Sequence, residues 1–244
     1  RFMETLSGIS AADISRVDFY TSHEALLLPY EAALTRSVPR RPGAYNLSTH
    51  FPWIGMRTAA TDEAHVEFFR GIRNPIGVKI GPALEPKDMG DFLERLMDKL
   101  HPDNEPGRLT LIHRYGASKV ADYLPALIEA VRATGKSVLF VCDPMHGNTR
   151  KTEANIKTRS FEDILSEVEQ AIDIHAACNS HLGGVHFELT GENVTECTGG
   201  ARGLTDEDLK DGYKSLVDPR LNYEQSLEMA LSIARRLAPA RGSS

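Results

Sequence analysis

The sequence predicts an α/β protein built as a (β/α)8 TIM barrel, with about six of the eight βα units present in this chain of 244 residues. Three observations favour this fold. Short β-branched runs alternate with amphipathic stretches, which is typical of parallel strands covered by helices. No Gly-x-Gly-x-x-Gly loop or Walker A sequence follows these runs, which disfavours an open nucleotide-binding sheet. Polar residues gather where successive strands end, as in barrel enzymes, whereas an open sheet gathers them near one switch point.

Four runs have the length and composition of buried strands and are bounded by Gly or Pro. They are 76–80, 109–112, 138–142 and 185–189. Weaker strand-like runs lie at 17–20, 45–47 and 51–54. Counted with the helices between them, these runs give six strand–helix units. We therefore expect about two N-terminal units of the barrel to lie outside this chain.

Apolar residues at helical spacing predict the helices. Three stripes cover 89–100, 124–131 and 161–172. The acidic residues of the third stripe are expected on its other faces: Glu162, Glu167 and Glu169. The last helix is expected to begin after an N-cap at Asn222 and to run to about Leu237. Its core-facing residues are expected to be Leu227, Ala230, Leu231 and Ala234.

The composition excludes several classes of protein. With 41% hydrophobic and 25% charged residues, the chain matches an average globular domain. Its net charge of −6 argues against a nucleic-acid partner, and no apolar run approaches the roughly 18 residues of a membrane span. Three cysteines give no disulfide framework, so we expect a cytoplasmic protein. We expect one barrel domain over residues 1–240 and a tail at 241–244.

Three basic residues are expected at the ends of different strands: Arg57, Lys79 and Arg114. Lys79 is unusual because it lies inside the apolar run 76–80, where a charge is costly unless it is paired. Neighbouring strands lie about 4.8 Å apart, so these residues could converge on one small anion. Arginine forks match phosphate and carboxylate groups. A pocket for such an anion is therefore predicted, with a buried ion pair and ordinary surface arginines as the alternatives.

His146, Glu188 and Asp218 are the candidate metal ligands. His146 follows the strand-like run 138–142, Glu188 ends the next run, and Asp218 lies in a turn-like Asp-Pro sequence. One imidazole and two carboxylates suit a divalent ion such as Mn²⁺, Fe²⁺ or Co²⁺. The three are far apart in sequence, so their spacing does not specify a metal site, and each has a structural alternative. His186 is expected on the same side of its strand as Glu188, where it could support the ligands.

Eight collinear motifs between about Asp18 and Ala234 resemble the class II 3-deoxy-D-arabino-heptulosonate 7-phosphate (DAHP) synthases. They are TSHEALLLPYE (21–31), WIGMRT (53–58), NPIGVKIGP (74–82), GRLTLIHRYG (107–116), CDPMHGNT (142–149), KTRSF (157–161), GGVHFELTGENVTEC (183–197) and DPRLN (218–222). The resemblance implies a metal-dependent transferase with the barrel fold. Its substrates would be phosphoenolpyruvate and erythrose 4-phosphate, in the first step of the shikimate pathway to the aromatic amino acids. We expect Mn²⁺ before Co²⁺ or Fe²⁺, and a homo-oligomer.

The resemblance also implies roles for individual residues. Phosphoenolpyruvate is expected on Arg57, Lys79 and Arg114 and on the backbone of Met56. The metal is expected on His146, Glu188 and Asp218. Lys79 and His146 are the expected catalytic residues. Lys79 would deliver a proton, because a desolvated lysine gives up its proton readily.

Three departures from the family pattern leave alternatives open. The sequence has no counterpart of the family's metal-binding Cys on the first barrel strand. It also lacks the second-strand arginine and the Lys-Pro-Arg-Ser type loop that grip the sugar phosphate; all of these belong to the units expected outside this chain. Met56 stands where the family usually has Glu. The alternatives are a diverged paralogue acting on an amino or imino analogue in secondary metabolism, and a non-catalytic barrel fragment serving as a partner subunit.

Overall fold

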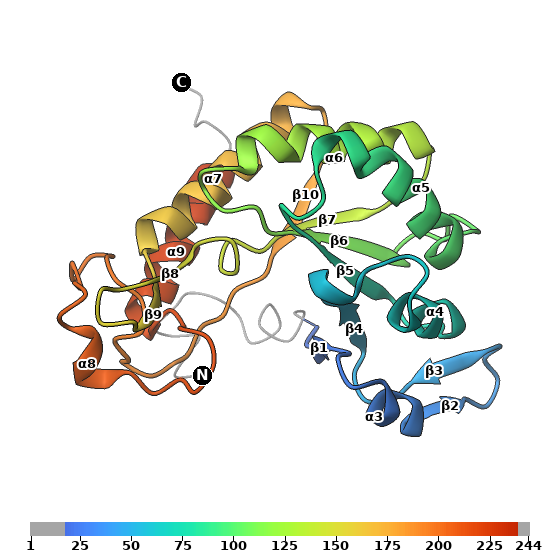
Figure 1. Ribbon diagram of the computed structural model, residues 1–244, viewed down its shortest axis with the longest axis horizontal. Helices are drawn as coiled ribbons and strands as arrows, with labels where there is room; N and C mark the ends of the chain where they lie inside the picture. The colour runs from blue at the N-terminus through green and yellow to red at the C-terminus, as the bar shows by residue number, and fades with distance from the viewer. Residues whose placement is uncertain (1–17, 239–244) are drawn as a thin grey trace, which may run out of the picture.

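The computed structural model describes residues 18–238 as an α/β structure around one parallel sheet (Figure 1). The strand order is β1–β4–β5–β6–β7–β10, and every neighbouring pair is parallel. The strands are β1 (Ser22–Glu24), β4 (Phe51–Ile54), β5 (Ile76–Ile80), β6 (Leu109–His113), β7 (Leu139–Cys142) and β10 (Leu182–Val185). The predicted α/β class with six parallel strands is confirmed. Closure of the sheet into a barrel stays a prediction, since β1 and β10 form its two edges within the described residues.

The helices are α3 (Leu28–Ala33), α4 (Ala64–Gly71), α5 (Met89–Leu100), α6 (Val120–Thr134), α7 (Phe161–Ala177), α8 (Leu209–Gly212) and α9 (Tyr223–Leu237), with 3-10 turns η1 (Met56–Thr58) and η2 (Pro86–Asp88). From α4 to α7 they follow one another along the outer side of the sheet, whereas α8 lies among loops away from it (Figure 1). The core lies between this layer and the sheet, where Val78 of β5 and Leu93 of α5 join one buried cluster. Among residues 18–238, no helix combines the length and hydrophobicity that crossing a bilayer requires.

Two antiparallel hairpins lie outside the main sheet. β2 (Thr35–Ser37) pairs with β3 (Ala44–Asn46), and β8 (Thr149–Lys151) pairs with β9 (Lys157–Arg159). The run predicted at 45–47 is therefore a hairpin strand and no member of the parallel sheet. The turn at 38–43 contains two prolines and a glycine, which return the chain directly onto β2 without a helical crossover.

Two strand predictions were displaced along the chain. The run at 17–20 is not a strand where it is described, and its first residue lies outside the described residues, as does the expected tail at 241–244. The strand is β1, because pairing with β4 places His23 opposite Pro52. β10 ends at Val185, so Glu188 lies in the loop that follows. Two glycines give β10 a low intrinsic strand preference, which is why the sequence pattern missed it.

Asn222 caps α9 as predicted. Its side chain accepts a hydrogen bond from the Gln225 backbone N–H, and the Gln225 side chain accepts one from the Asn222 backbone N–H. The predicted buried face of α9 is wrong: Gln225 and Met229 are buried, whereas Leu227 and Leu231 are 58% and 49% exposed. The other predicted core positions, Ala230 and Ala234, are exposed too. The reason is that α9 packs chiefly on α7, and the side of the helix that carries Leu227 and Leu231 is exposed.

Candidate active site

A cavity of about 620 Å³ opens where the parallel strands end. All seven residues predicted for the site line it: Met56, Arg57, Lys79, Arg114, His146, Glu188 and Asp218. Lys79 belongs to β5, and the others lie in segments that follow β4, β6, β7 and β10. Because the carboxyl ends of parallel strands meet at the same edge, residues far apart in sequence come together there.

His146, Glu188 and Asp218 converge on one side of the cavity. Nε2 of His146 lies 3.2 Å from Oε1 of Glu188 and 3.4 Å from Oδ2 of Asp218. Nδ1 of the same ring lies 2.8 Å from Oδ2 of Asp143, which accepts the Nδ1 proton and orients the ring so that Nε2 faces the two carboxylates. Burial opposes a charge on His146, but its hydrogen bonds to Asp143 and Glu188 outweigh burial and raise the pKa of His146.

The donor set fits a divalent cation. One donor atom from each of His146, Glu188 and Asp218 lies within 4.8 Å of the other two. One imidazole nitrogen with two carboxylate oxygens suits ions of intermediate hardness. The carboxylate of Asp143 behind the imidazole is the usual partner of a metal-binding histidine.

Two basic residues of the β8–β9 hairpin hold these carboxylates. Arg159 is fully buried and donates a hydrogen bond to Glu188. Its Nη2 lies 3.4 Å from Oδ2 of Asp218. Lys157 pairs with the other oxygen of Asp218. Burial would raise the pKa of both carboxyls, but hydrogen bonds from His146 and Lys157 and the charge of Arg159 outweigh it and lower both pKa values. Both basic residues were missed from the sequence, where their only signal was the KTRSF motif.

Lys79 enters the cavity from the middle of the sheet. Side chains alternate along a strand, so Lys79 points away from the helix-side core that contains Val78. It is 5% exposed, pairs with Asp143, and its Nζ lies 5.7 Å from the centre of the Trp53 ring. The ion pair considered as an alternative therefore exists, and Lys79 lines the cavity as well. Burial disfavours ionised Asp143, but the hydrogen bond from His146 and the charge of Lys79 hold its pKa well below the usual range.

Arg114 reaches the cavity from the loop after β6. Its Nη2 donates to the carbonyl oxygen of His146, and its Nη1 lies 3.5 Å from Sδ of Met56. Its Nε is buried and has no hydrogen-bond partner in the described part of the chain. A buried guanidinium donor without a partner suits an anionic ligand in the cavity. Arg57 follows Met56 in η1, and both line the same space.

His186 also lines the cavity, beside Glu188, as the sequence led us to expect. Its ring packs edge-on against Trp53, with the centroids 5.0 Å apart. Burial and the charge of Lys79 lower the pKa of His186 to about 4, so this imidazole is neutral near pH 7. Glu24 of β1 adds a further carboxylate to the lining.

The fold and the cavity together define a parallel α/β protein in which basic side chains and a candidate set of metal ligands share one cavity at the strand ends. The chain belongs to the class-II DAHP synthetase family, whose model matches residues 1–234. It is 48% identical, over 250 aligned positions, to the Neurospora crassa protein named phospho-2-dehydro-3-deoxyheptonate aldolase, across 96% of this chain and 51% of that protein. The family resemblance of the eight motifs is thereby confirmed.

Two bacterial relatives give the same result. The phospho-2-dehydro-3-deoxyheptonate aldolases of Streptomyces coelicolor and Mycolicibacterium smegmatis are each 47% identical, across 93% and 94% of this chain and 50% of each relative. The chain thus spans about half the length of the curated relatives it matches. A solved structure of the Francisella tularensis SCHU S4 aldolase of that name overlaps 77% of this chain and 55% of its own, with a TM-score of 0.44 and 18% identity.

Proposed function

We propose that this chain forms part of a DAHP synthase, which joins phosphoenolpyruvate to erythrose 4-phosphate and releases phosphate. The observation that carries the proposal is the single cavity that three basic side chains share with His146, Glu188 and Asp218. The names of relatives at 47% to 48% identity support it. An anion-binding side and a metal-binding side within one cavity match the needs of a reaction between an enol phosphate and an aldehyde.

Arg57, Lys79 and Arg114 would bind the phosphate and carboxylate groups of phosphoenolpyruvate. The buried, unpartnered Nε of Arg114 supports this role. Met56 begins η1, where N–H groups have no partner within the turn, so its backbone is suited to a phosphate oxygen. These contacts would neutralise the substrate and orient its enol carbon.

His146, Glu188 and Asp218 would hold the divalent cation, with Mn²⁺ as our first choice and Co²⁺ or Fe²⁺ as alternatives. When bound, such an ion would act as a Lewis acid towards an aldehyde oxygen. The contribution of the chain is to keep the donors in place. Arg159 grips both carboxylates, and Asp143 orients the imidazole.

Lys79 is the residue we propose for proton transfer. The new bond joins the terminal CH₂ carbon of phosphoenolpyruvate to the aldehyde carbon. The π electrons of the C=C bond form it, the π bond of the aldehyde breaks, and the aldehyde oxygen gains a proton. Lys79 lines the cavity and is held by the buried carboxylate of Asp143. Water then adds at the carbon that bore the phosphate ester, and loss of phosphate makes the overall reaction irreversible.

A phosphate-release assay tests the proposal on the protein expressed from its complete gene. With phosphoenolpyruvate and erythrose 4-phosphate we expect one phosphate per phosphoenolpyruvate consumed, loss of activity with a chelator, and recovery with Mn²⁺. The imino analogue of erythrose 4-phosphate is offered in parallel, because Met56 places a thioether against Arg114. Absence of phosphate release with both aldehydes, in protein that binds Mn²⁺, contradicts the proposal.

A further inference from the structure

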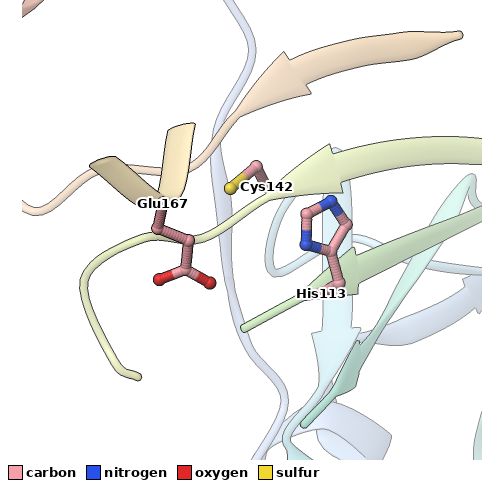
Figure 2. Close-up of side chains that lie close together, drawn as sticks. All are labelled: His113, Cys142 and Glu167. Atoms are coloured by element: carbon pink, nitrogen blue, oxygen red, sulfur yellow. The ribbon is translucent and has the colours of Figure 1, made fainter. Parts of the chain in front are cut away.

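A second cluster of metal-ligand residue types lies between the sheet and α7. Donor atoms of His113, Cys142 and Glu167 come within 4.8 Å of one another (Figure 2). All three residues are 0% exposed, so the expectation that Glu167 lies on a face of α7 away from the core is wrong. With only three donors here and the oxygens of Glu167 already hydrogen-bonded, the carboxylate has a different role from metal binding.

The carboxylate of Glu167 receives three hydrogen bonds. Its Oε1 accepts from the backbone N–H groups of Tyr115 and Gly116, each at 2.9 Å. Its Oε2 accepts from the side-chain amide of Asn148 at 2.8 Å. Both lone pairs of Oε1 are thereby used. Glu167 therefore ties α7 to two separate loops at once.

These two loops carry opposite sides of the cavity. Tyr115 directly follows Arg114 in the loop after β6, and Asn148 lies two residues after His146 in the loop after β7. The Oδ1 atom of Asn148 also accepts from the backbone N–H of Ala117 at 2.9 Å. Glu167 and Asn148 thus form one hydrogen-bonded bridge between the loops, and we call these two residues the loop bridge.

Burying the ionised carboxyl of Glu167 is unfavourable, and so is removing it from the loop bridge. Burial disfavours the ionised carboxyl, while hydrogen bonds from Gly116, Tyr115 and Asn148 favour it, and the net effect raises the pKa of Glu167 to about 7. Asp143 also faces it and opposes its charge. An apolar residue in its place would leave the buried donors without acceptors, which is unfavourable for each of them.

We propose that Glu167 is a positioning residue, which sets the placement of Arg114 relative to His146 through the loop bridge. It lines no part of the cavity, so it acts through the backbone of both loops. The consequence for substrate rests on the proposed function, whereas the consequence for metal binding and loop order does not.

Glu167→Gln separates this role from simple packing. The new amide oxygen still accepts from Tyr115 and Gly116, but its NH₂ group meets the NH₂ group of Asn148. Two donors do not bond, so the loop after β7 is released. We expect the Mn²⁺ affinity and kcat/KM for phosphoenolpyruvate to fall about tenfold to a hundredfold, as for other residues that support metal ligands.

A double-mutant cycle supplies the rescue. Asn148→Asp in the Glu167→Gln background restores a donor–acceptor pair but loses the bond from Nδ2 to the Pro144 carbonyl, so we expect it to recover part of the lost Mn²⁺ affinity. Asn148→Asp alone places two carboxylates together and is expected to weaken binding. Additive effects of the two substitutions would overturn the proposal. Glu169→Gln removes the same charge from the same helix, outside these contacts, and is expected to change nothing.

Two further measurements test the inference without an activity assay and without relying on the folding of a single variant. Backbone hydrogen exchange at Ala117, whose N–H is bonded to Asn148, should accelerate in Glu167→Gln and slow again in the double variant, whereas exchange at Tyr115 and Gly116, which keep their acceptor, should change little. Asn148→Ala removes the loop bridge without a charge change, and an unchanged Mn²⁺ affinity in it contradicts the inference. If the wild type releases no phosphate while Mn²⁺ affinity and exchange follow the cycle, the proposed function fails and the positioning role stands.

Discussion

Gly147 lies against Gly116 with no room for a side chain on either residue. A Cβ atom on Gly147 would stand 2.3 Å from the backbone nitrogen of Gly116. Gly116 has a φ of +88°, and a Cβ atom there would stand 2.8 Å from the carbonyl oxygen of Gly147. The loop that carries Arg114 and the loop that carries His146 therefore touch backbone to backbone.

Gly147→Ala should force these loops apart. We expect the free energy of unfolding to fall by about 1–3 kcal/mol, as for overpacked sites, and Mn²⁺ binding to weaken with it. Gly90→Ala in α5 is the matched control, because a Cβ there meets nothing within 4 Å. That variant is expected to be neutral or more stable by up to about 1 kcal/mol. Urea denaturation measures the free energy of unfolding of both variants. Equal values for Gly147→Ala and Gly90→Ala would contradict the close packing of the loops.

His146→Ala should weaken Mn²⁺ binding by at least about a hundredfold, since it removes a ligand rather than a residue that supports one. His181 is exposed and outside the cavity, so His181→Ala is expected to bind Mn²⁺ as the wild type does. Titration followed by the electron paramagnetic resonance signal of free Mn²⁺ gives both constants. Equal affinity in the two variants would remove His146 from the ligand set.

Lys79→Met should affect both stability and turnover. The substitution removes one of the two charged partners of the buried carboxylate of Asp143, and breaking a buried ion pair costs about 3–5 kcal/mol in comparable cases. Lys79→Arg keeps the charge and should retain more of this stability, yet it should not restore turnover, because an arginine does not give up its proton. Full turnover in Lys79→Met would exclude proton delivery by this residue.

The stability of the folded protein should depend on Glu167 between pH 4.5 and 7. Its pKa is raised from 4.5 to about 7 on folding, chiefly by burial. The folded state therefore holds a proton that the unfolded state has lost in this range, so the contribution of Glu167 is fully present below pH 4.5 and declines as pH rises through 7. The difference in unfolding free energy between wild type and Glu167→Gln should decrease across this range. A difference that is flat with pH would contradict the raised pKa.

Met56→Glu tests how the residue against Arg114 affects substrate choice. The backbone N–H of residue 56 is kept, so we expect KM for phosphoenolpyruvate to change little. The new carboxylate would pair with Arg114, and we expect it to alter the ratio of kcat/KM values for erythrose 4-phosphate and its imino analogue. Met56→Leu is the control without a charge. An unchanged ratio in Met56→Glu would show that the side chain plays no part in the choice.

The central strands could be predicted from sequence because hydrophobic pattern and burial coincide there. The prediction of 76–80 agrees with β5 residue for residue. The bounds of β1 and β10 could not be predicted, because both strands are short and their extent depends on pairing with a neighbouring strand. The apolar stripe of α9 could be read from the sequence, but periodicity does not say which side of a helix another element covers.

The positions of the seven site residues followed from strand ends and motifs, although their roles remain proposals. Arg159, Asn148 and Glu167 were not found, because each acts through hydrogen bonds between segments that are distant in sequence. From sequence alone, a buried glutamate on an amphipathic helix cannot be told from a solvent-exposed one, because its hydrogen-bond donors come from other segments of the chain. Such contacts depend on the tertiary structure and have no local pattern.

Asp143 is bound at once by Lys79 and by His146. A ligand that attracts the ammonium group loosens one side of this shared carboxylate and changes how firmly the other side orients the imidazole. If the cavity binds an anion and a cation as proposed, we expect the two binding events to be thermodynamically coupled. By reciprocity, whatever factor an anion applies to the Kd of the cation, the cation applies to the Kd of the anion.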